Sequence, residues 1–226
     1  MVAGVGVVAV SLRHFFPEPW DGMGHGFTIA QYVVDMVAFI ENLGVGTLCL
    51  MGHTRGGHIA FRLAQRRAGP LAEAGPGARR RSGYFSDRRS VSSPIVRPCG
   101  RSGGEDRSGR HRRRIEPLSR CDRGPEGGLR LPAAAKQWLR DNAYTLLEQA
   151  NEHREPYSRA GAESIRVPTL FIGGQDTLGP LPTILRALAA HVPGTRTTMI
   201  PNTTHPMFEQ DSVRFQRRRS RLLGIS

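Results

Sequence analysis

The feature that most constrains the fold of this chain is a glycine-rich polar stretch, Gly52-His-Thr-Arg-Gly-Gly57, between two regular segments. The apolar run Thr47–Met51 precedes it and predicts a buried strand, while about Gly57–Arg67 follows it with the apolar spacing of a helix. Glycine adopts backbone angles that other residues avoid, so it suits a sharp turn from strand to helix. This order favours an α/β fold with a parallel sheet.

The rest of the chain supplies more elements of the same kind. Thr28 is placed to cap a helix whose apolar positions run from Ile29 to Ile40, with Gly44 at its expected end. Alternating strands and helices predict a mostly parallel sheet with flanking helices, and 226 residues fit a single domain. The further predictions are strands over Val5–Leu12, Pro168–Ile172 and Thr197–Ile200, helices over about Pro132–Asn151, Arg159–Ile165 and Leu181–His191, and a loop over Asn202–Asp211.

Two Arg-rich blocks interrupt this pattern. Residues 66–130 carry 17 Arg against 7 acidic residues and almost no periodicity, which predicts a poorly structured insert over 68–130 at the position of a small or degraded helical cap. A structureless loop of that length inside a compact domain counts against this interpretation. The pattern fails again after Phe215, in QRRRSRLLGIS.

The codon usage implied by the composition offers an explanation for both blocks. A single lysine, Lys136, beside 31 arginines indicates a GC-rich gene, in which shifted frames also encode Arg, Gly and Pro. Back-translation with a one-base shift restores a strand-like run from 72–78 and a helix-like run from 215–223. We therefore hypothesise that both blocks are out of frame, which the nucleotide sequence of the gene would test.

The formal net charge of +13 raises the question of nucleic-acid binding. The charge is concentrated in the two Arg-rich blocks, which lack the interleaved aromatic residues of a base-stacking surface and the spacing of zinc ligands. Nucleic-acid binding is therefore not expected, and it is weaker than the two functional alternatives considered below. Three scattered cysteines fit a reducing compartment, and the chain has neither an apolar run of ~18 residues nor a signal peptide, so we expect a cytoplasmic protein without a membrane partner.

Three residues far apart in the sequence have side chains suited to nucleophilic catalysis. Thr54 is the centre of the G-x-T-x-G stretch, Asp176 directly follows a predicted strand, and His205 lies in the loop after the next strand. The carboxyl ends of parallel strands meet at one edge of a sheet, where such side chains can converge. A hydroxyl becomes reactive when a base takes its proton, and the base needs a partner that fixes its tautomer. Simpler interpretations are a glycine-rich turn, a helix-capping aspartate and an ordinary loop histidine.

The chain order of nucleophile, acid and histidine resembles that of the α/β-hydrolase family, in particular its esterase-like members with a helical cap. The resemblance covers about Val5–Arg67 and Leu131–Phe215. It rests on VVAVSLRHFF, GHTRGGHIAFRLAQR, PTLFIGGQDTLGP and IPNTTHPMFEQD.

The resemblance implies a role for each site residue. Thr54 would be the nucleophile, His205 the general base and Asp176 the acid that orients the imidazole. The backbone amide of Arg55 would donate to the oxyanion, and His53 would line or brace the site. The implied reaction is hydrolysis of an ester or related acyl bond in a small-molecule substrate, with no cofactor.

Metal binding and assembly are separate questions. No metal is expected, because neither His53 nor His58 has matching acid or cysteine ligands. The sequence does not indicate an oligomeric state.

The chain departs from the family pattern in two ways. Thr54 stands where the family has serine, and its extra methyl group is costly in the strained turn and restricts χ1, so we expect reduced turnover. The second departure is at the start, where the strand and the loop that commonly provide another oxyanion donor do not precede Val5, so we expect an N-terminal truncation. The alternative to an active hydrolase is therefore a catalytically impaired or inactive remnant of one.

Overall fold

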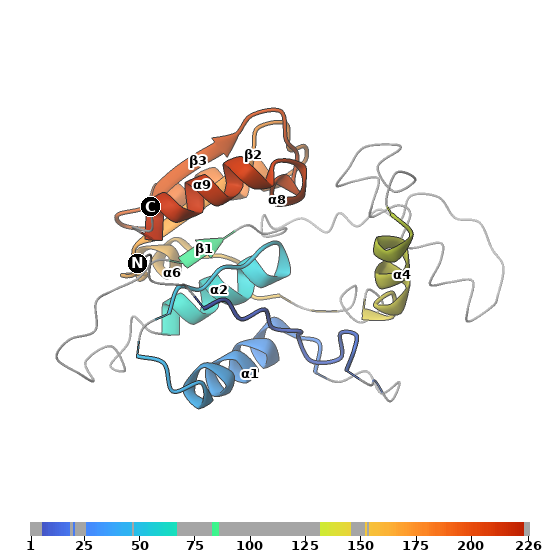
Figure 1. The fold of residues 1–226 in the computed structure, drawn as a ribbon. Helices are drawn as coiled ribbons and strands as arrows, with labels where there is room; N and C mark the ends of the chain where they lie inside the picture. The colour runs from blue at the N-terminus through green and yellow to red at the C-terminus, as the bar shows by residue number, and fades with distance from the viewer. Residues whose placement is uncertain are drawn as a thin grey trace, which may run out of the picture.

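The computed structural model describes residues 6–18, 20, 26–46, 48–66, 83–85, 132–145, 152 and 154–223. These segments hold the helices and strands labelled in Figure 1. None of the helices in the described segments is long and apolar enough to cross a membrane. The elements are α1 (Ile29–Asn42), α2 (Arg55–Arg66), β1 (Gly83–Phe85), α4 (Ala133–Asp141), α6 (Arg159–Glu163), β2 (Thr169–Gly174), α7 (Leu181–His191), β3 (Arg196–Ile200), α8 (Met207–Gln210) and α9 (Ser212–Leu223).

The strands form a parallel sheet in the order β1-β2-β3. Phe171 of the central strand lies opposite Phe85 on one side and Thr197 on the other. All six residues of β2 are buried, as expected for a parallel strand covered by helices on both faces. The strands predicted over Pro168–Ile172 and Thr197–Ile200 are confirmed, with slightly different ends.

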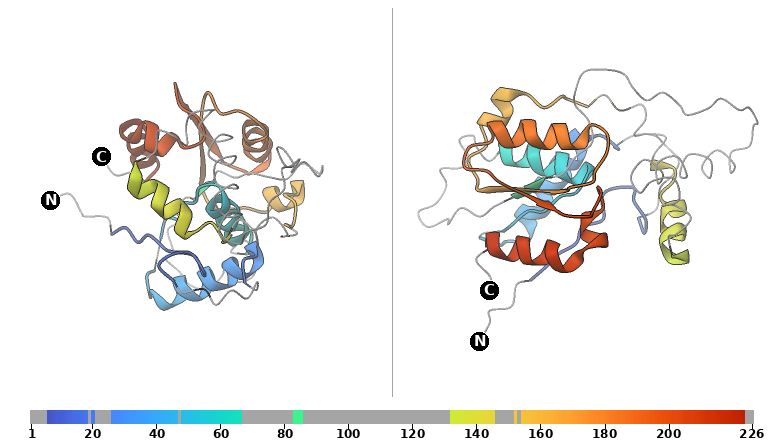
Figure 2. Two further views of the ribbon diagram at one scale, coloured as in Figure 1. Left: turned by 90° about the vertical axis from the view of Figure 1, so that its right-hand side faces the viewer. Right: turned by 90° about the horizontal axis from the view of Figure 1, so that it is seen from above.

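Helices cover the two faces of the sheet, and the alternation of side chains along β2 divides the core between them (Figure 2). Phe171 points to the face covered by α2 and α7, where it packs with Phe61 and Ile184. Leu170 and Ile172 point to the opposite face, where Ile200, Met207 and Phe215 complete a second cluster under α8 and α9. The predicted fold class, a parallel sheet with flanking helices, is confirmed.

Helix α1 packs against α2 rather than against the strands. Tyr32 and Val33 are almost completely buried there, in one cluster with Ile59 and Leu63 of α2. The predicted cap is present, because Thr28 Oγ1 accepts a hydrogen bond of 3.1 Å from the backbone N–H of Gln31. The helix ends at Asn42, and Gly44 follows with a φ of +62°.

Two predicted strands are not formed as expected. Residues 6–12 pair with no strand among the described residues, and Val7 and Val8 are 72% and 62% exposed. The run before the turn has only an isolated bridge at Met51. Both predictions rested on apolar runs alone, whereas a strand also needs a neighbour that satisfies its backbone hydrogen bonds.

Parts of both Arg-rich blocks fall within the described residues. Strand β1 comes from the block over 68–130, and the rest of that block lies outside the described residues. The tail after Phe215 continues α9, because arginine is a good helix former and the buried Phe215 anchors the helix to the sheet. The predicted loop after β3 also contains the short helix α8. The helix predicted over about Pro132–Asn151 is present as α4 up to Asp141, and residues 146–151 of the prediction lie outside the described residues.

Candidate active site

The turn after Met51, where the sequence predicts a nucleophile elbow, has a strained backbone. Thr54 has a φ of +54°, in the left-handed region that few residues other than glycine adopt. Gly52 makes the turn possible, because a Cβ atom there would lie 2.1 Å from the carbonyl oxygen of Gly56. The turn is closed by a 2.9 Å hydrogen bond from the Gly56 amide to the His53 carbonyl, and α2 begins at Arg55. Thr54 is thereby held at the tip of the turn.

A second loop brings His205 to the same place. This loop follows β3, and Thr203 Oγ1 donates a 2.8 Å hydrogen bond back to the carbonyl of Ile200. Gly174, at the end of β2, permits the approach of the loop, since a Cβ atom there would lie 2.1 Å from the Thr204 carbonyl oxygen. His205 is only 5% exposed.

The structure brings Thr54 and His205 together. Thr54 Oγ1 lies 2.8 Å from His205 Nε2, a normal hydrogen-bond distance. With the imidazole neutral and Nε2 unprotonated, this nitrogen accepts the hydroxyl proton. A hydroxyl paired in this way with a base is the arrangement that nucleophilic catalysis requires.

Asp176 lies at the same end of the sheet, beside the loop that carries His205. Its backbone N–H donates a 2.8 Å hydrogen bond to the carbonyl of Thr203, two residues before His205. The residue is exposed. Its role as the orienting acid stays a prediction.

His53 contacts the loop of His205 directly. The two imidazole rings stack with centroids 4.2 Å apart, and His53 Nε2 lies 3.1 Å from the carbonyl oxygen of His205. Since a carbonyl can only accept, His53 must carry its proton on Nε2 in this contact. The ring of Phe208 closes the other side at 4.7 Å. This placement is suited to the bracing role expected for His53.

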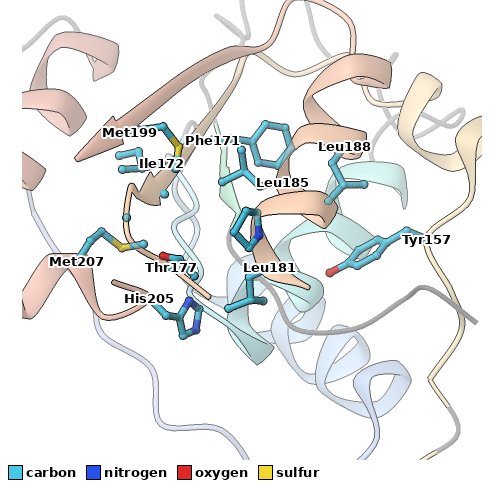
Figure 3. A pocket seen from close by; sticks show the side chains of 13 residues that line it. Tyr157, Phe171, Ile172, Thr177, Leu181, Leu185, Leu188, Met199, His205 and Met207 are labelled. Atoms are coloured by element: carbon cyan, nitrogen blue, oxygen red, sulfur yellow. The ribbon is translucent and has the colours of Figure 1, made fainter. Parts of the chain in front are cut away.

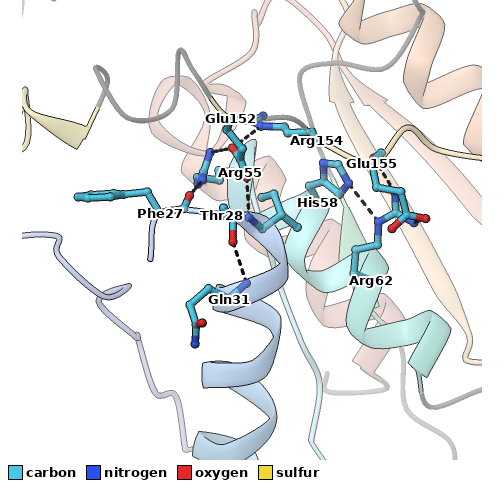
Figure 4. Close-up of polar contacts among 10 residues, drawn as sticks. Phe27, Thr28, Gln31, Arg55, His58, Arg62, Glu152, Arg154 and Glu155 are labelled. Atoms are coloured by element: carbon cyan, nitrogen blue, oxygen red, sulfur yellow. Dashed lines mark hydrogen bonds and ion pairs between the residues drawn. The ribbon is translucent and has the colours of Figure 1, made fainter. Parts of the chain in front are cut away.

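Arg55 is placed with its backbone at the start of α2 and its side chain away from Thr54. Backbone N–H groups in the first turn of a helix lack partners within the helix, as the predicted oxyanion donor must. The buried guanidinium instead forms a 2.7 Å ion pair with Glu152, which sequence reasoning missed (Figure 4). No spacing rule links two residues 97 positions apart, so no local signal could have identified this partner.

An apolar cavity adjoins His205 between β2 and α7 (Figure 3). Its volume of about 30 Å³ is enough for one or two water molecules. The cavity lining includes Tyr157, Leu181, Leu185, Met199 and Met207. Any substrate group that enters from the side of His205 therefore meets mostly hydrocarbon.

A metal centre is not evident in the described part of the chain. No group of three His, Cys, Asp or Glu side chains gathers there in a way that could hold an ion. His58 is fully buried on α2, where its Nε2 accepts a 3.3 Å hydrogen bond from Arg62 and its ring packs on Tyr157.

Comparison with solved structures supports the fold. An enol-lactonase from Burkholderia xenovorans LB400 aligns with a TM-score of 0.64 and 19% identity, over 87% of this chain and 73% of the lactonase. A bromoperoxidase from Bacillus anthracis aligns with a TM-score of 0.64 and 15% identity, over 90% of this chain and 77% of the bromoperoxidase. An esterase from Exiguobacterium antarcticum aligns with a TM-score of 0.56 and 17% identity, over 88% of this chain and 74% of the esterase. At these identities the likeness concerns the fold alone.

Comparison at the level of sequence identifies the family. A search of curated proteins finds no match to this chain. Residues 2–217 match the model of the family described as "Alpha/beta hydrolase family". The match spans nearly the whole sequence. Together with the parallel sheet, this match shows that the chain belongs to the α/β-hydrolase family.

Proposed function

We propose that this protein hydrolyses an ester, lactone or related acyl bond of a small molecule through a covalent acyl-enzyme. The observation that carries the proposal is the 2.8 Å contact between Thr54 Oγ1 and His205 Nε2, at an elbow with a φ of +54°. The esterase and the enol-lactonase among the structural neighbours support the choice of bond. The apolar cavity beside His205 favours a small, apolar acyl portion.

In the proposed first step, Thr54 Oγ1 attacks the carbonyl carbon while its proton passes to His205 Nε2. The C–O bond to the leaving alcohol then breaks, and the alcohol takes the proton from the imidazole. Backbone N–H groups at the start of α2, including that of Arg55, face the developing negative charge. Asp176, whose backbone N–H bonds to the loop of His205, is assigned to the Nδ1 side of the imidazole.

The second step is the reverse chemistry with water in place of the alcohol. His205 takes a proton from water, the resulting hydroxide attacks the acyl carbon, and Thr54 leaves with its proton restored. The products are a carboxylic acid and the alcohol, with no net redox change. For a lactone the two products are one hydroxy acid.

A second candidate is a catalytically impaired hydrolase that keeps the fold. One observation favours it: the β-branched Thr54 has a left-handed backbone conformation. The two candidates differ in whether Thr54→Ser restores turnover.

The test is turnover of p-nitrophenyl butyrate and of a γ-lactone by the full chain. We expect the His205→Gln variant to lose at least about 10²-fold in kcat, the lower range for a general base. The matched control is His191→Gln, which removes a histidine from the last turn of α7, far from Thr54 in the sequence and 37% exposed. Equal rates for the wild type and His205→Gln would overturn the proposal, and inactivity of both the wild type and Thr54→Ser would favour the impaired hydrolase.

We also propose a cytoplasmic location and a small-molecule substrate as the only partner, without nucleic acid. The location follows from the scattered cysteines. The absence of nucleic acid follows from the composition of the Arg-rich blocks. Retention on a nucleic-acid column that falls steeply with salt would contradict the second proposal.

A further inference from the structure

A buried ion network lies directly behind the elbow (Figure 4). Glu152 Oε2 accepts hydrogen bonds from Arg55 Nη1 at 2.7 Å and from Arg154 Nε at 2.8 Å. Its other oxygen accepts one of 2.6 Å from the backbone N–H of Ile29, the first residue of α1. Arg55 Nη2 donates in addition to the carbonyl of Phe27. One carboxylate thereby joins the start of α1, the start of α2 and the segment around residue 152.

The members of this network are buried too deeply for an incidental surface pair. The side chains of Arg55 and Glu152 are 7% and 2% exposed. Burial raises the pKa of Glu152, but the charges and hydrogen bonds of Arg55 and Arg154 outweigh it and hold that pKa below its ordinary value. Burial also lowers the pKa of Arg55, against the pull of Glu152. A charge buried to this degree is tolerated only while its partner stays in place.

The network leaves the first residue of α2 little freedom. The guanidinium of Arg55 lies over the ring of Tyr32 at 5.1 Å, between Glu152 and the carbonyl of Phe27. The residue before it is Thr54, whose positive φ persists only if the surroundings hold it. Glu152 is thus the one acidic group in a position to hold the residue next to Thr54, among the residues that the structure describes.

Helix α2 also binds the backbone of residues 155–156, shortly after Glu152. Arg62, seven positions after Arg55 and so on the same face of α2, donates to the carbonyls of Glu155 and Pro156 at 2.6 and 2.9 Å. The next residue, Tyr157, lines the cavity beside His205. Helix α2 therefore contacts both Glu152 and residues 155–156, next to the Tyr157 that lines a wall of that cavity.

We infer that Glu152 is a positioning residue of the active site: by binding Arg55, it holds the elbow in the conformation in which Thr54 meets His205. This inference rests on the proposed hydrolase function for its kinetic consequences. It is distinct from that function, because it predicts the rigidity of the elbow whether or not the enzyme turns over a given ester.

The test compares Glu152→Gln with the wild type in two assays. The glutamine keeps an oxygen for the Ile29 amide and removes the charge that Arg55 needs. The first assay is amide hydrogen exchange by mass spectrometry, where we expect residues 53–58 to exchange at least about tenfold faster. The second is steady-state turnover, where we expect kcat to fall at least about tenfold with KM changed by less than about twofold. The matched control is Glu163→Gln, which breaks an exposed ion pair with Arg159.

A double variant, Arg55→Met with Glu152→Gln, separates positioning from stability. With both charged groups removed, the guanidinium is no longer buried without its carboxylate. The melting temperature should therefore recover towards that of the wild type while kcat stays low. Recovery of kcat together with stability would overturn the inference, as would unchanged exchange at residues 53–58 in Glu152→Gln. If the wild type hydrolyses none of the esters, the proposed function fails, and the exchange assay still decides the role of Glu152.

Discussion

The backbone of Thr54 predicts that serine would serve better at this position. A φ of +54° is strained for any residue with a Cβ atom, and more so for a β-branched one, because both substituents on Cβ meet the neighbouring peptide groups. Thr54→Ser keeps the hydroxyl that contacts His205 Nε2 and removes only the methyl group. We expect both stability and turnover to rise.

The magnitude follows from two opposing terms. Strain of this kind costs on the order of 1–3 kcal/mol, and serine retains part of it, so the relief is about 1–1.5 kcal/mol. Loss of the methyl costs about 0.8 kcal/mol when the group is fully buried, and about half of that for the half-buried Thr54. The net gain of about 0.5–1 kcal/mol raises the melting temperature by roughly 1–4 °C in a chain of this length.

Turnover should rise by more than stability, because the methyl group also restricts χ1 and crowds the approach of a carbonyl carbon. A gain of about tenfold in kcat corresponds to about 1.4 kcal/mol in the barrier. The assays are p-nitrophenyl butyrate hydrolysis and thermal unfolding of the same preparations. If serine leaves both the rate and the melting temperature unchanged, the strain at residue 54 does not limit this enzyme and the reasoning is wrong.

Three further predictions concern the supports of the site. Gly52→Ala places a Cβ atom 2.1 Å from the Gly56 carbonyl oxygen, so α2 must shift; we expect a loss of about 2–3 kcal/mol in urea unfolding and of measurable turnover. Asp176→Asn removes the charge assigned to the imidazolium of His205, and kcat should fall at least about 10²-fold; an unchanged kcat would remove Asp176 from the mechanism. The pKa of Glu152 is depressed in the fold, so its contribution to the free energy of unfolding is complete above its ordinary value of 4.5 and is lost as the pH falls below it; Glu152→Gln should flatten that part of the stability profile.

The sequence was sufficient for the elements whose signals are local. The α1 helix was predicted from its cap at Thr28 and its apolar spacing, and α7 was predicted to the residue, because both carry a continuous helical pattern between clear ends. The strand β2 was recognisable as an apolar run that ends in two glycines. The likeness of the glycine turn to an elbow was also a local feature.

The failures concern features that depend on distant parts of the chain. Residues 6–12 look like a strand, but pairing requires a partner that no local pattern specifies. The arginines of α9 break the apolar pattern, and among the side chains described in that helix Phe215 is the one buried in the core. The pair of Arg55 and Glu152 was invisible for the same reason, since burial makes a charge pair necessary and burial is a property of the folded chain.

Two close backbone approaches explain how a hydroxyl and an imidazole 151 positions apart come to share a hydrogen bond. The missing side chain at Gly52 lets α2 begin immediately behind the turn, which fixes the hydroxyl of Thr54 from one side. The missing side chain at Gly174 lets the loop after β3 fold over the end of β2, which brings His205 from the other side. Because β2 and β3 are parallel and Gly174 lies opposite Ile200, the loops after both strands leave the sheet at the same edge. Either approach alone would leave one group without its partner, so the proposed chemistry depends on two glycines that take no part in it.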